Sequence, residues 1–166
     1  MSSIDIRRAY VDDMHIISYV MSKSWQAAYT HIIPPEAMEE SIHINCHKAV
    51  LDRMLSDGIY DMLICEYNGS PSGIIANNHQ CGNVYEISLV YTLLEVWGTG
   101  CGNALMDEAL RRIYNTGCSH VYLWVFNGNK RAQRFYEKYG FSADGTERNS
   151  QFGTRQTRYM LKLNKD

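Results

Sequence analysis

Apolar residues recur at helical spacing in the first third of the chain and at strand spacing in much of the remainder. An apolar and basic stretch at 4–9 predicts a short strand, and apolar positions three or four residues apart predict a helix over 11–29. A second helix is expected over about 36–55, because Pro35 suits a first helical turn, with a break near Ile44 and Asn45. The first third is therefore predicted to be mainly helical.

After Gly58 the pattern changes to that of β-strands. Two apolar runs at 60–67 and 73–79 flank a turn-forming stretch, which predicts a hairpin. The remaining expected elements are strands over 84–91, 120–126, 142–148 and 155–163, and helices over 103–114 and 129–139. Because hairpins and helices alternate without a linker or an internal repeat, the sequence predicts one mixed α+β domain spanning 1–166.

Two of the predicted strands carry more detailed expectations. The run at 120–126 is continuously apolar, so we expect it to be buried on both faces. Period-2 alternation divides the run at 84–91 between two opposite faces of a strand. One face is expected to carry Glu86, Ser88 and Val90, and the other Tyr85, Ile87, Leu89 and Tyr91.

Composition and charge exclude several classes of partner. The chain is 45% hydrophobic and 20% charged, as ordinary globular proteins are, and its net charge of −2 gives no electrostatic basis for binding nucleic acid. No apolar run is long enough to span a membrane, and charges occupy the N-terminal stretch where a secretion signal needs apolar residues. We therefore expect a cytoplasmic protein that binds neither nucleic acid nor membrane.

The five cysteines are scattered and form no Cys-x-x-Cys pair, which is typical of reduced thiols that pack as small apolar side chains. His43, Cys46 and His47 would share one face of a helix, and this spacing is a first indication of a metal site. No acidic residue or second pair of ligands completes the set, so we expect a partly solvated helix face and no metal.

A glycine-rich loop between a predicted strand and a predicted helix is the most informative stretch of the chain. Gly98, Gly100 and Gly102 directly precede the helical pattern that begins at Asn103. Unpaired N–H groups at such a helix start favour a phosphate or pyrophosphate, and glycines permit its close approach. A plain tight turn produces the same pattern, so the loop by itself leaves both interpretations open.

A second stretch, at 124–141, makes the first one specific. It follows the pattern Asn-x-x-Ala-x-x-Phe-Tyr-x-x-x-Gly-Phe, through Asn129, Ala132, Phe135, Tyr136, Gly140 and Phe141. With this stretch and with the loop glycines Gly100 and Gly102, the chain resembles the GNAT superfamily of N-acetyltransferases, which use acetyl-CoA. The close resemblance covers 84–141, and both motifs occur in the family's order.

The resemblance implies a mixed, mostly antiparallel central sheet flanked by helices, in which a splayed pair of strands holds acyl-CoA. The pyrophosphate would bind the N–H groups of the loop, which comprises Gly98, Thr99, Gly100, Cys101, Gly102 and Asn103. Trp97 stands where the family usually has Gln or Arg, and Thr99 stands where a basic residue is common. Arg131, together with Lys130 and Arg134, would compensate at the 3′-phosphate of the nucleotide.

The resemblance also assigns roles near the thioester. Backbone groups of Val90, Tyr91 and Thr92 would polarise the thioester carbonyl. Asn129 would hold the pantetheine arm or cap the helix that follows it. Cys101 is a poor candidate for a nucleophile, because no histidine or other activating base lies near it in the sequence.

Acid and base candidates follow from the same two motifs. Glu86 lies within an apolar strand, where a carboxylate is costly unless it has a partner or a function, and several family members carry a catalytic glutamate there. A base and a hydrogen-bonded structural glutamate both fit this placement. Tyr136 is the candidate acid that would protonate the leaving thiolate, and its alternative is a core tyrosine with its hydroxyl at the rim.

Three functions remain open from the sequence. The first is direct acetyl transfer from acetyl-CoA to a primary amine of a small molecule or peptide, and the second is a non-catalytic sensor of acyl-CoA. The third, a dinucleotide-binding domain, lacks the required Gly-x-Gly-x-x-Gly spacing. Trp25, Tyr29 and the loop at 149–154 are expected to bind the amine. Family members often form homodimers, and the sequence leaves open whether this chain does.

Overall fold

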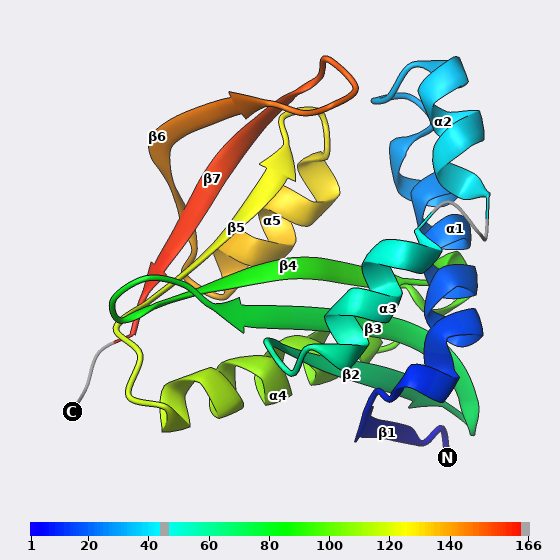
Figure 1. Ribbon diagram of the computed structural model, residues 1–166, viewed down its shortest axis with the longest axis horizontal. Helices are drawn as coiled ribbons and strands as arrows, with labels where there is room; N and C mark the ends of the chain where they lie inside the picture. The colour runs from blue at the N-terminus through cyan, green and yellow to red at the C-terminus, as the bar shows by residue number, and fades with distance from the viewer. Residues whose placement is uncertain (44–46, 164–166) are drawn as a thin grey trace.

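A seven-stranded sheet runs through the computed structural model, which describes residues 1–43 and 47–163 (Figure 1). The strands are β1 (Ile4–Arg8), β2 (Tyr60–Tyr67), β3 (Ser70–His79), β4 (Val84–Thr92), β5 (His120–Phe126), β6 (Ser142–Asn149) and β7 (Arg155–Lys162). Their order is β1-β2-β3-β4-β5-β7-β6, and each neighbouring pair is antiparallel except β4 and β5. The predicted mixed, mostly antiparallel sheet is confirmed, and the dinucleotide-binding fold with its parallel sheet is wrong.

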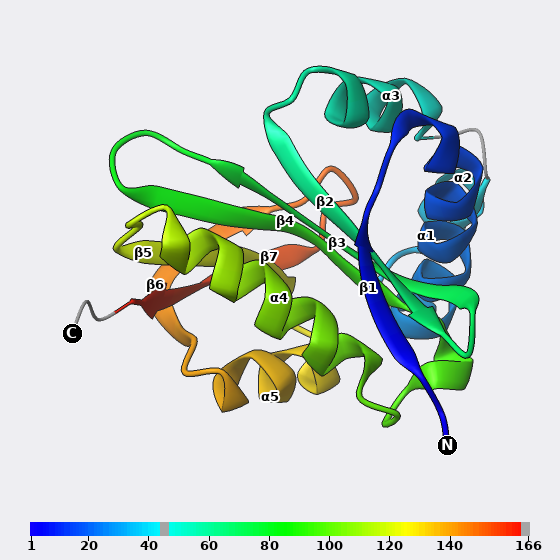
Figure 2. The ribbon, with the colours of Figure 1, turned by 90° about the horizontal axis from the view of Figure 1, so that it is seen from below.

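Helices cover both faces of this sheet (Figure 2). On one face lie α1 (Met14–Tyr29) and α3 (Lys48–Ser56), and α2 (Pro35–Ile42) packs on α1. On the other face lie α4 (Cys101–Asn115) and α5 (Lys130–Lys138). Short 3₁₀ helices, η1 (Val11–Asp13) and η2 (Leu94–Val96), precede α1 and α4. No helix in the described part of the chain is long and apolar enough to cross a membrane.

Each face of the sheet has its own apolar core. Leu105 and Met106 of α4 are fully buried in one core, and Ile17 and Val20 of α1 are fully buried in the other. Removing such side chains from water stabilises the fold by about 1.5–3 kcal/mol each. The two cores therefore hold α1 and α4 in fixed positions on opposite faces of β4, which both helices contact.

The helix expected over about 36–55 is two helices, α2 and α3. The break expected near Ile44 and Asn45 lies outside the described residues. His43 is the extended residue that ends α2, and His47 caps the start of α3, so the expectation that they share one helix face is wrong. The ring of His47 instead contacts the carbonyl oxygen of Ser41 at 3.1 Å.

The expectation that 120–126 is buried on both faces is also wrong. In β5, the side chains of Val121, Leu123 and Val125 are buried, whereas Tyr122 and Trp124 are only half-buried. The inner face of β5 packs into the core under α4 and α5. Its outer face carries aromatic residues beside the arginines of β6 and β7, so long aromatic side chains, rather than a second apolar layer, explain its apolar sequence.

A β-bulge interrupts β4 where it pairs with β3. Ala76 of β3 lies opposite Leu89, but the next residue, Asn77, lies opposite Ile87. Ser88 is therefore the extra residue of β4, and its hydroxyl donates a 2.9 Å hydrogen bond to the side chain of Asn78. An extra residue of this kind reverses which face the following side chains occupy.

The bulge overturns the simple alternation predicted for β4. Glu86, Ser88 and Val90 do not share one face opposite Ile87 and Tyr91. Instead, Ile87 and Val90 both pack into the core beside α4, and Tyr91 packs on the side of α1. The practical result is that Glu86 and Tyr91 line the same cavity, although an unbroken strand would direct them to opposite faces.

Strands β4 and β5 are paired at one end and separated at the other (Figure 1). Their parallel pairing runs from Val84 and His120 to Glu86 and Tyr122. Beyond it, β4 stays paired with β3 as far as Thr92, and β5 stays paired with β7 as far as Phe126. The splayed pair expected from the sequence is present, and its opening lies between α1 and α5 (Figure 1).

Candidate active site

A cavity of about 690 Å³ occupies the opening between the splayed strands. Its walls come from the C-terminal half of α1, the end of β4, the glycine loop and α5. The volume lies within the range of small-molecule and cofactor sites. Of the candidate cofactor residues, those that line it are Val90, Tyr91, Thr92, Trp97, Gly98, Gly100, Asn103, Asn129 and Arg131. We refer to it as the large cavity.

The glycine loop forms the start of α4 at one end of the large cavity. Gly98 and Gly100 adopt positive φ angles of 80° and 102°, and Gly100 is the residue that caps the helix. Among the described residues no side chain caps the first turn of α4, so its N–H groups have no side-chain partner there. A Cβ added at Gly98 would meet nothing within 4 Å, which means that the space beside this residue is open.

Three residues of the loop do not line the large cavity in the described structure: Thr99, Cys101 and Gly102. The N–H of Thr99 donates to the carbonyl oxygen of Val96 at 3.2 Å, so this group already has a backbone partner. The side chain of Cys101 is fully buried in the core, where it receives a 3.3 Å hydrogen bond from the hydroxyl of Thr99. Burial, with help from Cys101, raises the pKa of the adjacent Cys65 to about 12.

Basic side chains gather along the α5 wall of the large cavity, at Lys130, Arg131, Arg134 and Lys138. The guanidinium carbon of Arg131 lies 3.6 Å from the centre of the Trp97 ring, a cation–π contact. The indole N–H of Trp97 in turn donates to the carbonyl oxygen of Thr92 at 3.1 Å. Trp97 thus fixes Arg131 at the edge of the large cavity. The guanidinium of Arg131 supplies the positive charge that the glycine loop lacks.

Three phenols converge where the large cavity meets the splayed strands: Tyr29, Tyr91 and Tyr136. Tyr136 is buried, with 8% of its surface exposed, and burial followed by the nearby Tyr91 raises the pKa of its phenol. Burial also raises the pKa of Tyr29 and of Tyr91. All three therefore keep their protons at neutral pH, and a phenol that keeps its proton can donate it to a stronger base.

Neighbouring residues set the position of Tyr136. The side chain of Asn129 accepts a 3.2 Å hydrogen bond from the N–H of Ala132 and so caps the start of α5. Phe135 packs against Tyr139, with ring centres 5.3 Å apart, while its ring faces Gly102 of α4. These contacts fix the rotation of α5 and direct Tyr136 into the cavity wall.

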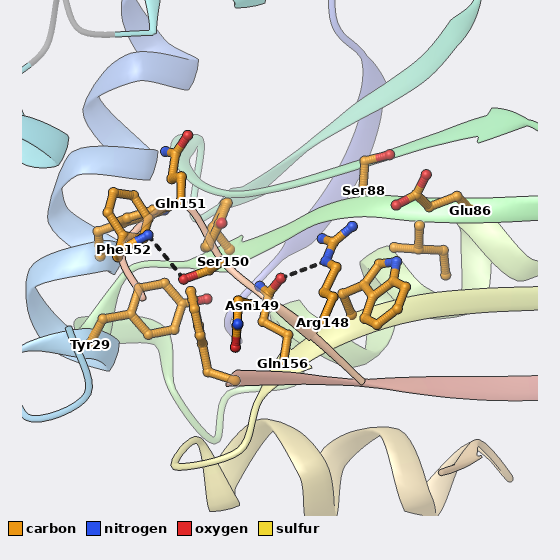
Figure 3. A pocket seen from close by; sticks show the side chains of 14 residues that line it. Tyr29, Glu86, Ser88, Arg148, Asn149, Ser150, Gln151, Phe152 and Gln156 are labelled. Atoms are coloured by element: carbon orange, nitrogen blue, oxygen red, sulfur yellow. Dashed lines mark hydrogen bonds between the residues drawn. The ribbon is translucent and has the colours of Figure 1, made fainter. Parts of the chain in front are cut away.

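A second cavity, of about 350 Å³, lies on the other side of the splay (Figure 3). We refer to it as the small cavity. Tyr29 and Tyr91 line both cavities, so the two meet at these side chains. Aromatic side chains form much of its wall, and the ring of Phe152 stands edge-on to that of Trp25 at 5.6 Å between centres. Both amine-binding candidates, Trp25 and Tyr29, line it.

Glu86 supplies the carboxylate of the small cavity and is half-buried there. Its Oε2 accepts hydrogen bonds from the hydroxyl of Tyr122 at 3.2 Å and from the side-chain amide of Gln80 at 3.3 Å. No partner for Oε1 and no ion pair of Glu86 is found among residues 1–43 and 47–163. One carboxylate oxygen is therefore held in place while the other is left for a ligand or a water molecule.

Two buried polar atoms in the cavity walls have no hydrogen-bond partner in the described part of the chain: Ser24 Oγ and Trp25 Nε1. Ser24 is 3% exposed and lines the large cavity, and Trp25 is 8% exposed and lines the small one. An unpaired buried polar group costs about 1–3 kcal/mol. Native proteins avoid such groups, so a polar partner for Ser24 in the large cavity is indicated, whereas the indole of Trp25 interacts with the adjacent phenol of Tyr91.

Sequence reasoning missed Ser24 and Arg148 as site residues. Ser24 reads as a small residue on the apolar face of a helix, and only its burial beside the cavity distinguishes it. Arg148 lies just before the loop at 149–154 that was expected to bind the amine, and β6 brings it to the small cavity. No cluster of three or more potential metal ligands occurs among the residues that the structure describes.

The sequence model of the acetyltransferase (GNAT) family matches residues 18–141, and the chain belongs to this family. An uncharacterized N-acetyltransferase of Mycobacterium tuberculosis is 29% identical over 134 residues, which are 81% of this chain and 86% of that protein. Another uncharacterized N-acetyltransferase, YuaI of Bacillus subtilis, is 26% identical over 141 residues, 82% of this chain and 79% of that protein. The family that the two motifs predicted is therefore confirmed.

Solved structures share the fold. The PaiA N-acetyltransferase from Thermoplasma acidophilum, crystallised in complex with coenzyme A, superimposes with a TM-score of 0.78 at 23% identity. The alignment covers 94% of this chain and 98% of that one. At such identity the likeness establishes the architecture of the chain alone.

Proposed function

We propose that the chain is an acetyl-CoA-dependent N-acetyltransferase that moves the acetyl group directly to a primary amine of a small molecule or peptide. The observation that carries this proposal is the meeting of two cavities at one gap between strands, with Tyr29 and Tyr91 common to both walls. Direct transfer needs two substrates whose reacting atoms touch, and such an arrangement brings them together without a covalent enzyme intermediate.

The large cavity suits coenzyme A for three reasons. The uncapped start of α4 and the basic side chains of α5 provide N–H donors and positive charge for its phosphates. The open edge of β4 at Val90 and Thr92 suits an extended amide chain such as pantetheine. The unpartnered hydroxyl of Ser24 needs a polar ligand atom. The coenzyme A bound by the Thermoplasma relative is consistent with this assignment.

In the proposed reaction the amine nitrogen attacks the thioester carbon, a C–N bond forms, and the C–S bond breaks. Glu86 takes the amine proton, directly or through a water molecule, at its unpaired Oε1. Tyr136, whose phenol lines the large cavity, gives its proton to the departing thiolate, which leaves as the free thiol of coenzyme A. Backbone groups from Val90 to Thr92 polarise the thioester carbonyl.

A non-catalytic sensor of acyl-CoA is not favoured. Such a sensor needs the large cavity alone, whereas this chain also has an adjoining cavity with a positioned carboxylate. We also propose that 1–166 form a single acetyltransferase domain, because β1 and β7, from opposite ends of the chain, belong to one sheet.

Release of free thiol from acetyl-CoA in the presence of a panel of primary amines tests the proposal. The panel comprises the common amino acids, their amides, polyamines, aminoglycosides and short peptides with free N-termini. Thiol release that depends on one acceptor class, together with a product 42 Da heavier by mass spectrometry (about one acetyl group for one proton), is expected. Thiol release that is the same with and without every amine would contradict the proposal.

A further inference from the structure

The chemistry of the small cavity defines its acceptor more narrowly than a primary amine. Its wall contains one carboxylate, Glu86, and one guanidinium, Arg148, among aromatic and neutral polar residues (Figure 3). The two charges interact, because Glu86 acts electrostatically on Arg148, yet they form no ion pair. A ligand in this cavity therefore meets two separate and opposite charges.

Arg148 is held in position by its neighbours. Its Nε donates a 2.8 Å hydrogen bond to the side chain of Gln156 on β7. Its guanidinium carbon lies 4.1 Å from the centre of the Trp124 ring on β5. Arg148 is an exposed residue, and these two contacts restrict its guanidinium on one edge and one face, so less entropy is lost when it binds a ligand.

The terminal nitrogens of Arg148 have no protein partner within the described residues. In Figure 3 they point away from Gln156, toward the part of β4 that carries Ser88 and Glu86. Two parallel N–H donors on a fixed plane match the two oxygens of a carboxylate.

We infer that the acceptor is a free α-amino acid with an apolar or aromatic side chain, whose carboxylate binds Arg148 and whose amine faces Glu86. The inference rests on the proposed function. A zwitterion matches the single positive and single negative group of the cavity. The rings of Trp25, Tyr29, Phe126 and Phe152 lie 5.0–5.6 Å apart in edge-on pairs and form an apolar surface for the side chain.

Other acceptor classes fit less well. A polyamine would place a second ammonium near Arg148, and the wall offers no second carboxylate to compensate it. A peptide N-terminus has an amide where the amino acid has its carboxylate, so the guanidinium would lose its charged partner. The volume of about 350 Å³ is at the low end for ligand sites and suits a molecule of amino-acid size.

Matched acceptors test the inference in the thiol-release assay. L-Phenylalanine and L-leucine are compared with their amides, with 2-phenylethylamine and isopentylamine, with spermidine, and with a tetrapeptide that begins with phenylalanine. We expect kcat/KM for the amino acids to exceed that for the amides and simple amines by about 10- to 100-fold, the usual effect of one charge-assisted pair. Equal or faster acetylation of the amide, the simple amine, spermidine or the peptide would overturn the inference.

Variants make the test specific to one side chain. Arg148→Gln is expected to lower kcat/KM for the amino acid about 10- to 100-fold and to lower that for 2-phenylethylamine by a much smaller factor, and Arg148→Lys is expected to restore part of the loss. Arg155→Gln is the control, because Arg155 belongs to the same hairpin but pairs with Glu147 outside the cavity. Equal losses for both acceptors in Arg148→Gln would contradict the assigned contact.

The two proposals fail in different ways. Acetylation of simple amines or polyamines in preference to amino acids refutes the acceptor class and leaves the acetyltransferase in place. Thiol release that responds to no acceptor refutes the proposed function itself. Calorimetric titration of each variant with coenzyme A checks folding, since a folded Arg148→Gln protein keeps the large cavity intact and binds as the unmodified chain does.

Discussion

Replacing Tyr136 by phenylalanine removes one hydroxyl from the wall of the large cavity, close to Tyr91, which both cavities share. The phenol is buried and lines the large cavity, and no hydrogen bond to it is found in the described part of the chain. Its loss therefore leaves no protein group unpaired and opens no cavity in the core. We expect Tyr136→Phe to fold as the unmodified chain does and to bind coenzyme A with unchanged affinity.

Turnover should fall sharply in this variant. A positioned general acid contributes about 10²- to 10⁴-fold to rate, so kcat is expected to fall by at least about 100-fold, or about 2.7 kcal/mol in the barrier. The lower limit applies here because Tyr29 and Tyr91 lie where the two cavities meet and also keep their protons. Either hydroxyl can replace part of the lost function.

The pH profile gives a second readout. Burial raises the pKa of Tyr136, so the proton that it donates remains bound at every pH below that raised value. The unmodified enzyme should therefore keep its activity as pH rises through the ordinary range of a tyrosine, near 10, where a solvent-exposed phenolic acid would lose it. A fall in kcat centred at that ordinary value would contradict the placement of Tyr136.

Stopped-flow or steady-state measurement of thiol release supplies kcat for both proteins, and calorimetry supplies the affinity for coenzyme A. Tyr139→Phe is the matched control. It removes a phenolic hydroxyl one residue after α5 that donates to Asp107 at 2.9 Å and does not line either cavity. Unchanged kcat in Tyr136→Phe, or an equal loss in both variants, would refute the acid role.

Two further changes test the base and the acid stability of the fold. Glu86→Gln keeps the shape of the small cavity and is expected to lower kcat/KM at least about tenfold at neutral pH; an unchanged kcat/KM would assign the base elsewhere. Arg111 and then Arg112 lower the pKa of Glu108 from 4.5 to about 2, so the stability from this carboxylate is present above pH 4.5 and is lost as pH falls toward 2. Thermal unfolding of Glu108→Gln should therefore depend less on pH in that window, and an unaltered dependence would contradict the network.

Local pattern was enough to predict most of the fold. Turn residues at 68–71, Pro35 in the first turn of α2 and the cap Asn129 act within a few residues, and the elements that they bound are present. The two motifs also predicted the starts of α4 and α5, because each glycine or asparagine has its effect at the start of its own helix, whereas the opening between the strands was expected from the family resemblance. Features that depend on neighbouring residues in the sequence were therefore accessible without a structure.

The small cavity depended on contacts between distant strands. Ser88 becomes a bulge only because Ala76 and Asn77 of β3 pair with β4 in a shifted register, and this shift brings Glu86 to the face of Tyr91. Arg148 reaches the same cavity because β6 pairs with β7 and β7 pairs with β5. Register of this kind is a property of the assembled sheet, and periodicity along one strand does not contain it.

The central claim is that the large cavity binds coenzyme A at the glycine loop, and a matched pair of glycine variants tests it. Gly98 and Gly145 have similar positive φ angles, 80° and 86°, and an added Cβ would meet nothing within 4 Å at either site. Gly98→Ala and Gly145→Ala should therefore cost the fold a similar amount, about 1 kcal/mol. Of these two glycines, Gly98 lines the large cavity and Gly145 does not.

Calorimetric titration of coenzyme A into the unmodified chain and both variants is the most direct measurement. We expect the unmodified chain and Gly145→Ala to bind with the same affinity. We expect Gly98→Ala to bind at least about tenfold more weakly, because its methyl group occupies the space beside the loop that a phosphate must enter. Absence of binding to the unmodified chain, or equal affinity for all three proteins, would contradict the account.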